Sequence, residues 1–259
     1  MMGGRRGKNI FQALCMLRDN YCIPGTTNGQ SDQYEGSVSG MATYILIHGG
    51  NMSADTWNRL SGKHDYPEGT QIGAKYWDGT LSVLREHGHR VFAPTLADEH
   101  THNLSDHIGQ IRSLAEAEDL HDAILVGHSY GGMVITGVAD RMTDRVRRLV
   151  YIDAALPDPG QSLFDLFSEG GVDPLSFPGL EAASAYVEKL QFDPRTLEKL
   201  PKTYILCTGS EFAVVTRGAK KKIIVNPLGW TYLELPTSHV PMATMPDRLN
   251  QLLLSVAEE

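Results

Sequence analysis

Short, continuously apolar runs alternate along the chain with longer stretches in which apolar residues recur at helical spacing. The apolar runs predict strands at Thr43–Ile47, His89–Ala93, Ala123–Val126, Arg148–Ile152, Thr203–Cys207 and Thr231–Leu235. The periodic stretches predict helices at Trp77–His87, Leu104–Glu118, Gly131–Met142, Ser184–Leu190 and Pro246–Val256. Strands that alternate with helices pair in parallel through right-handed crossovers. The pattern therefore predicts an α/β fold with a mostly parallel, doubly wound sheet.

Two regions depart from this alternation. Residues 1–40 are rich in Gly, Ser, Asn and Gln, and we expect an N-terminal extension or linker that need not be native, with a helix packed on the domain as the alternative. Residues 156–202 are too long for an ordinary connection and carry many large apolar side chains, which predicts a helical cap inserted after the strand ending near Asp153. Residues 41–259 would form one domain that includes this cap.

Composition excludes several classes of partner. The net charge is -8 and the one basic cluster is Lys220–Lys222, so we expect no nucleic acid. No apolar run is long enough for a membrane helix, so we expect a cytoplasmic protein that does not bind a membrane. Cys15, Cys22 and Cys207 form no C-x-x-C pair, which disfavours both a disulfide framework and a zinc site. A homodimer stays open.

Gly127-His128-Ser129-Tyr130-Gly131 fits G-x-S-x-G and stands between a predicted strand and a predicted helix. A nucleophile on such a sharp turn needs small residues two positions away on either side, and Gly127 and Gly131 meet that need. The start of the helix would also direct backbone N–H groups at a developing oxyanion. This context predicts Ser129 as a nucleophile rather than part of a simple glycine turn.

A second glycine-rich turn, His48-Gly49-Gly50, follows the first predicted strand directly. Glycine there lets the backbone approach a substrate closely. We expect the N–H groups of Gly50 and Tyr130 to form an oxyanion hole.

His239 lies after the last predicted strand and before the last predicted helix, so its loop could reach Ser129. The chain has ten histidines, and position rather than residue type distinguishes this one. Seven others are expected to be surface or loop residues: His64, His87, His89, His100, His102, His107 and His121. We predict His239 as the general base.

Two acidic residues are candidates to orient the imidazole of His239. Asp153 lies at the end of a predicted strand, where the sheet would fix its position, whereas Glu211 lies in a loop after the next one. We favour Asp153, with Glu211 as the alternative acid; either could instead be purely structural, as a cap or a solvated helix start.

From Met41 onward the chain resembles an α/β-hydrolase of the plant methyl-esterase and hydroxynitrile-lyase group and its bacterial esterase relatives. The resemblance rests on His48-Gly49-Gly50, Gly88–Val91, Ala93–Leu96, Leu125–Gly132, Leu149–Ala154 and Ser238-His239 with Met242. It implies the α/β-hydrolase fold and hydrolysis of a small carboxylic ester through an acyl-enzyme, with no metal or organic cofactor.

Two departures from this group bear on the reaction. The lyases resemble one another in a threonine and a lysine at places where this chain has Gly49 and Val240, and Val240 cannot stabilise departing cyanide. The group's usual acid after Thr203–Cys207 is missing, whereas haloalkane dehalogenases carry it where Asp153 stands. The alternatives to an esterase are a ligand-binding protein with little turnover and another reaction on the same residues, such as a lactonase, amidase or hydroxynitrile lyase.

Overall fold

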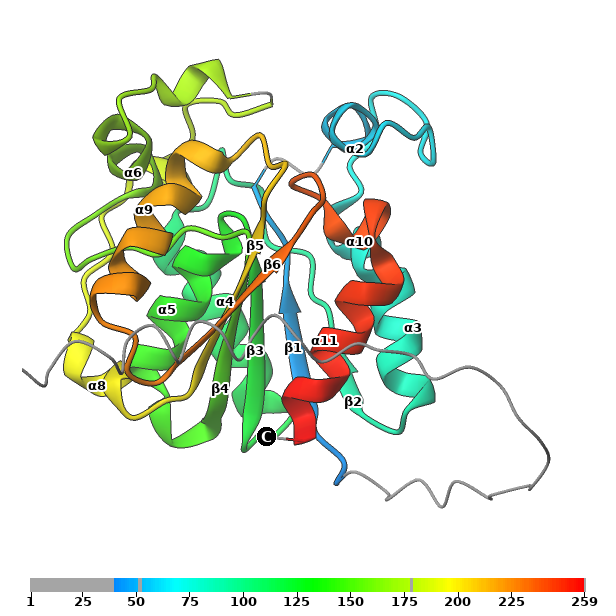
Figure 1. Ribbon diagram of the computed structural model, residues 1–259, viewed down its shortest axis with the longest axis vertical. Helices are drawn as coiled ribbons and strands as arrows, with labels where there is room; N and C mark the ends of the chain where they lie inside the picture. The colour runs from blue at the N-terminus through cyan, green and yellow to red at the C-terminus, as the bar shows by residue number, and fades with distance from the viewer. Residues whose placement is uncertain (1–39, 51–52, 178, 259) are drawn as a thin grey trace, which may run out of the picture. The chain divides into compact units, whose positions relative to one another are not determined.

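The computed structural model describes residues 40–50, 53–177 and 179–258, and the predicted N-terminal extension lies almost entirely outside these ranges. Six strands form one sheet: β1 (Thr43–Ile47), β2 (Arg90–Phe92), β3 (Ala123–His128), β4 (Val146–Ile152), β5 (Lys202–Cys207) and β6 (Trp230–Leu235). All neighbouring strands are parallel, in the order β2-β1-β3-β4-β5-β6 (Figure 1). Because all the strands are parallel, their carboxyl ends share one edge of the sheet.

Helices connect the strands and cover both faces of the sheet. The helices are α2 (Ala54–Ser61), α3 (Asp78–Glu86), α4 (Leu104–Ala117), α5 (Gly131–Arg141), α6 (Leu163–Glu169), α7 (Ser184–Val187), α8 (Pro194–Glu198), α9 (Ala213–Val225), α10 (Pro241–Thr244) and α11 (Pro246–Glu258). Short 3₁₀ turns form at η1 (Gly73–Trp77), η2 (Thr143–Arg145) and η3 (Pro174–Ser176). None of the helices within the described ranges is long and apolar enough to cross a membrane.

The sheet separates two apolar cores. Successive side chains of a strand point to opposite faces, so Ile45 and Ile47 join the core under α4, α5 and α9, while Tyr44 and Leu46 join the core under α3 and α11. In Figure 1, α4, α5 and α9 lie on one side of the strands and α3 and α11 on the other. Strands buried on both faces have no polar alternation, in agreement with the continuous apolar runs at residues 44–47 of β1 and 123–126 of β3.

Residues 156–202 carry α6, α7, α8 and η3 between β4 and β5. A capping box fixes the start of α6, because the Ser162 and Asp165 side chains each accept a hydrogen bond from the other residue's backbone N–H. An isolated bridge between Gln161 and Leu190 closes this segment on itself. The predicted helix Ser184–Leu190 is too long, because α7 ends at Val187. The next residue, Glu188, is no longer helical, and its carboxylate accepts hydrogen bonds from the Ser105 hydroxyl and N–H.

The lysine cluster Lys220–Lys222 lies near the C-terminal end of α9. The Lys222 ammonium donates to the Leu156 carbonyl at 2.9 Å and pairs with Asp158 at 3.0 Å. Lys220 pairs with Glu234 on β6 at 2.9 Å. These lysines therefore tie α9 to the chain segments beside it.

Candidate active site

Ser129 stands on the sharp turn between β3 and α5 with a backbone φ of 55°. A side chain in this left-handed region is strained and persists only where the surroundings enforce it. The turn is tight because a Cβ on Gly127 would lie 2.5 Å from the Gly131 carbonyl oxygen, and one on Gly131 would lie 2.7 Å from that of Ile47. Glycine at these two positions lets the turn form, and the turn presents the Ser129 hydroxyl beyond the strand end.

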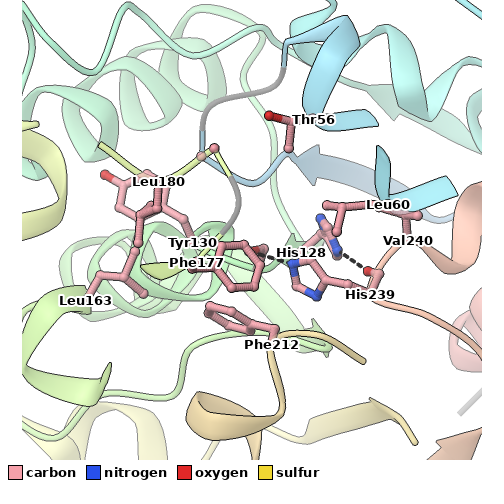
Figure 2. A pocket seen from close by; sticks show the side chains of 13 residues that line it. Thr56, Leu60, His128, Tyr130, Leu163, Phe177, Leu180, Phe212, His239 and Val240 are labelled. Carbon is pink, nitrogen blue, oxygen red and sulfur yellow. Dashed lines mark hydrogen bonds between the residues drawn. The ribbon is translucent and has the colours of Figure 1, made fainter. Parts of the chain in front are cut away.

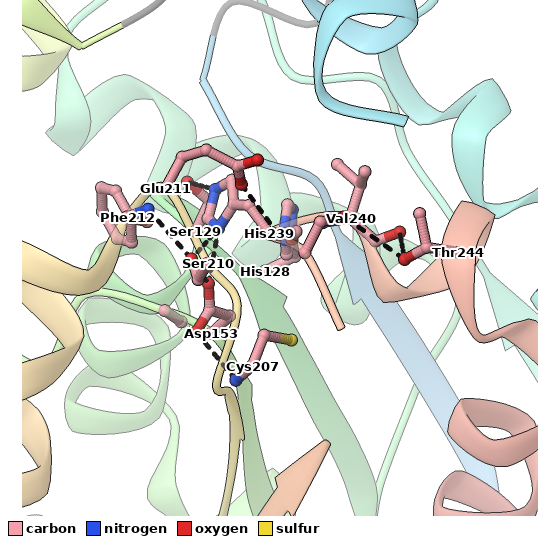
Figure 3. Close-up of polar contacts among 12 residues, drawn as sticks. His128, Ser129, Asp153, Cys207, Ser210, Glu211, Phe212, His239, Val240 and Thr244 are labelled. Atoms are coloured by element: carbon pink, nitrogen blue, oxygen red, sulfur yellow. Dashed lines mark hydrogen bonds and ion pairs between the residues drawn. The ribbon is translucent and has the colours of Figure 1, made fainter. Parts of the chain in front are cut away.

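Ser129, His239 and Asp153 form one row of hydrogen bonds (Figure 3). The Ser129 hydroxyl lies 2.9 Å from His239 Nε2, and His239 Nδ1 lies 2.7 Å from Asp153 Oδ2. Because a carboxylate only accepts, Nδ1 donates to Asp153 and Nε2 is free to accept from Ser129. A hydroxyl bonded to an imidazole that is held by a buried carboxylate can act as an activated nucleophile.

Asp153 directly follows β4 and is completely buried. Its backbone N–H donates to the Ile205 carbonyl at 2.7 Å, and its φ of 43° turns the side chain toward His239. The Cys207 N–H donates to Oδ1 at 3.0 Å, and the Ser210 hydroxyl donates to Oδ2. These donors replace the water that a buried carboxylate loses.

Glu211, the alternative acid, contacts the other side of His239. Its Oε2 accepts the backbone N–H of His239 at 3.1 Å, and no contact joins the carboxylate to the imidazole among the described residues. The His239 carbonyl is held in turn by Nε2 of His128 at 2.7 Å. Glu211 therefore fixes the loop, and Asp153 faces the ring.

The turn after β1 is fixed by His48. The Leu96 N–H donates to His48 Nε2 at 2.8 Å, so Nδ1 carries the proton and donates to the Gly49 carbonyl at 2.7 Å. Burial in this site lowers the pKa of His48 to about 4, so the ring is neutral at pH 7. The C=O and N–H of a trans peptide point in opposite directions, so holding the Gly49 carbonyl orients the N–H of Gly50.

A pocket opens at Ser129 and His239 (Figure 2). Its space measures about 450 Å³, including the part that opens to solvent. The apolar lining comes from α2 (Leu60), from residues 156–202 (Leu163, Phe177, Leu180) and from the loops after β5 and β6 (Phe212, Val240). Gly50 and Tyr130 also line it, so the structure brings both expected oxyanion residues to the pocket that contains Ser129.

Sequence reasoning missed three residues around this site and misplaced a fourth. His128, Tyr76 and Ser210 surround the catalytic candidates, and only His128 carried a signal, as the variable position before Ser129. His107 is buried in α4, not at the surface or in a loop as predicted. His107 on α4 bonds the Tyr130 hydroxyl at 2.9 Å and the Ala97 carbonyl at 2.9 Å, contacts that a local pattern does not contain.

The described residues contain no group of three or more His, Cys, Asp or Glu side chains placed to hold a metal ion.

Residues 44–252 match the sequence profile of the "Alpha/beta hydrolase family". The chain belongs to the alpha/beta hydrolase family. A solved extracellular alpha/beta-hydrolase from a Paenibacillus species superposes with a TM-score of 0.63 at 22% identity, over 84% of this chain and 100% of that one. At this identity the likeness shows the alpha/beta hydrolase fold, which agrees with the predicted fold class.

Two curated relatives each match about half of the chain. A carbendazim hydrolyzing esterase of Nocardioides sp. (strain SG-4G) is 41% identical over 135 residues, which are 49% of this chain and 47% of the relative. An alpha-hydroxynitrile lyase of Arabidopsis thaliana is 30% identical over 146 residues, 49% of this chain and 54% of the relative. This alpha/beta hydrolase thus spans about half the length of the curated relatives it matches.

Proposed function

We propose that this alpha/beta hydrolase is a serine esterase that cleaves small, uncharged carboxylic esters. The observation that carries the proposal is the row of hydrogen bonds from Ser129 through His239 to Asp153, which ends in an apolar pocket. Support also comes from the similarity to an enzyme named an esterase.

Acylation follows from the geometry of this row. The Ser129 oxygen attacks the ester carbonyl carbon while His239 Nε2 takes its proton, and Asp153 stabilises the imidazolium. The negative charge on the former carbonyl oxygen is held by the N–H groups of Gly50 and Tyr130. When the tetrahedral intermediate collapses, the bond to the alcohol oxygen breaks and His239 returns the proton to that oxygen.

Deacylation uses the same groups with water as the nucleophile. His239 removes a proton from water, the hydroxide oxygen attacks the acyl carbon, and the bond to the Ser129 oxygen breaks. The proton returns from His239 to Ser129, and the carboxylic acid leaves. All proton transfers pass through Nε2, which faces Ser129.

The pocket favours an uncharged substrate. None of the described lining residues is Asp, Glu, Lys or Arg, and a charged acyl group would lose its hydration there without gaining an ion pair. Val240, the residue after His239, is fully buried and apolar, so a departing cyanide would also find no cation at that position. The apolar lining therefore favours ester hydrolysis over cyanohydrin cleavage.

Hydrolysis of short-chain p-nitrophenyl and methyl esters by the parent and by Ser129→Ala tests this function. Ser82→Ala on the exposed side of α3 is the matched control. We expect turnover by the parent and the control and a loss of at least about 10³-fold in kcat for Ser129→Ala. A folded parent that binds esters without hydrolysing them would instead indicate a ligand-binding protein.

A further inference from the structure

A chain of hydrogen bonds joins three segments of the site: the turn after β1, the end of β3 and the loop after β6. The Gly49 N–H donates to the Tyr76 hydroxyl at 2.8 Å, and this hydroxyl lies 3.2 Å from His128 Nδ1. His128 Nε2 lies 2.7 Å from the carbonyl oxygen of His239. Gly49 belongs to the turn after β1, His128 ends β3, and His239 belongs to the loop after β6.

The proton positions along this chain follow from its two ends. The His239 carbonyl can only accept, so His128 carries its proton on Nε2 and its Nδ1 accepts. Tyr76 must then donate to Nδ1 with its hydroxyl hydrogen and accept from Gly49 with its oxygen. Every bond in the chain therefore has one defined direction.

We propose that Tyr76 and His128 are positioning residues that hold the oxyanion turn and the His239 loop in register with Ser129. This proposal rests on the proposed esterase function. Tyr76 is buried and does not line the pocket, so it acts through the groups it binds. Its partner Gly49 is then held at both ends, at the N–H by Tyr76 and at the carbonyl by His48, which fixes the N–H of Gly50.

The other end of the chain fixes His239. Its N–H binds Glu211 and its carbonyl binds His128, so the backbone of this residue is held from both sides. His128 also packs against the imidazole of His239 with ring centroids 4.6 Å apart. Catalysis of this kind loses rate when a base or a donor moves by about 1 Å. Breaking this chain of hydrogen bonds should therefore lower kcat more than it weakens substrate binding.

Tyr76→Phe removes one oxygen atom and leaves the ring, which packs against Trp57 and Trp77. Tyr151→Phe is the matched control, because among the described residues its buried hydroxyl bonds Thr136 alone, away from these three segments. We expect Tyr76→Phe to lower kcat for p-nitrophenyl acetate by about 10-fold with KM changed less than about 2-fold. Equal kcat values in Tyr76→Phe and Tyr151→Phe would overturn the proposal.

Two substitutions of His128 each keep one of its two hydrogen bonds and remove the other. His128→Gln places an amide N–H near Nε2 and keeps the bond to His239, whereas His128→Asn places an oxygen near Nδ1 and keeps the bond to Tyr76. If the chain acts as a unit, Tyr76→Phe lowers kcat much less in the His128→Asn background than in the parent. Independent, multiplying effects of the two changes would contradict a connected chain.

Nitrogen-15 NMR of the histidine side chains tests the chain without any substrate. We expect His128 to be protonated on Nε2 alone, and the Nδ1 resonance to shift in Tyr76→Phe but not in Tyr151→Phe. An unchanged Nδ1 resonance in Tyr76→Phe would refute the chain even if the protein is an esterase. If the Nδ1 resonance shifts in Tyr76→Phe as expected but the parent hydrolyses no ester, the esterase function is refuted and the hydrogen-bond chain stands.

Discussion

Two acidic residues contact His239, and they bind different parts of it. Asp153 bonds the imidazole, and Glu211 bonds the main-chain N–H of the same residue. The sequence favoured Asp153 but left Glu211 as an alternative, because both follow strands that end at the same edge of the sheet. The choice depends on the register of β4 against β5, which pairs Ile152 with Ile205 and places Asp153 under the ring.

Asp153→Asn and Glu211→Gln should therefore differ in activity. An amide at position 153 cannot stabilise the imidazolium and can favour the wrong tautomer, so we expect kcat to fall by roughly 10³-fold. Glu211→Gln keeps an oxygen that accepts the His239 N–H, so we expect a loss of less than about 10-fold. Steady-state hydrolysis of p-nitrophenyl acetate measures both, and a larger loss in Glu211→Gln would reverse the assignment.

His48 makes stability depend on pH. Burial lowers its pKa from 6.5 to about 4 in the folded state, so the unfolded chain binds more protons between these values. The contribution of His48 to the free energy of unfolding is therefore complete above pH 6.5. It declines as the pH falls toward 4, by about 3 kcal/mol in total. Burial likewise lowers the pKa values of His128 and His107, which adds to the trend.

His48→Asn isolates this contribution. Its amide nitrogen can still donate to the Gly49 carbonyl, but the side chain does not titrate in this range. Denaturant unfolding at about pH 7 and about pH 4.5 should show a smaller loss of unfolding free energy in the variant than in the parent. The same loss in both proteins would show that His48 does not carry the effect.

At the scale of elements, strands were easier to predict than helices. Each predicted strand begins and ends within two residues of an observed one. The central strands β1 and β3 are almost entirely buried, so their sequences are nearly continuous apolar runs. The helices α2, α9 and α10 were not predicted, and α6 and α8 were expected only as parts of a helical cap. α9 interrupts its apolar residues with Gly218 and the lysine cluster, so its sequence lacks a clear helical period, and contacts with β6 and residues 156–202 stabilise it.

The close approach of α5 to the chain after β4 gives a test at this scale. A Cβ on Gly132 would collide with the Ala155 carbonyl oxygen, whereas one on Gly109 in α4 meets nothing within 4 Å. We expect Gly132→Ala to destabilise the protein by about 2 kcal/mol or more. Gly109→Ala should stabilise it by about 0.5 kcal/mol, because alanine loses less backbone entropy. Thermal unfolding of the two variants measures this difference. Equal changes of the unfolding temperature would show that the close approach at Gly132 does not affect stability.

At the scale of the whole molecule, the site draws on parts far apart in the sequence. The reacting groups come from the carboxyl edge of the sheet, and residues 156–202 supply Leu163, Phe177 and Leu180 to the pocket. Phe177 also packs edge-on against His239 and Phe212. The sequence predicted an inserted apolar segment here but could not predict which side chains enter the pocket, because the segment has little regular structure.

Phe177→Ala should enlarge the pocket and change its selectivity. We expect kcat/KM for acetate esters to fall by about 10-fold and the preference for longer acyl groups to rise. Phe192→Ala is the control, because Phe192 lies in the same segment but faces another cavity. A series of p-nitrophenyl esters of increasing acyl length measures this, and parallel profiles for both variants would place the acyl group elsewhere.

Covalent labelling identifies the nucleophile directly, because a fluorophosphonate transfers its phosphonyl group to an activated serine and the product does not turn over. We expect one phosphonyl group per chain, found by mass spectrometry on the peptide that carries Ser129, with esterase activity lost in proportion. Labelling should be abolished in Ser129→Ala and strongly slowed in Asp153→Asn. Phosphonylation of another residue in place of Ser129, or full esterase activity in Ser129→Ala, would show that Ser129 is not the nucleophile.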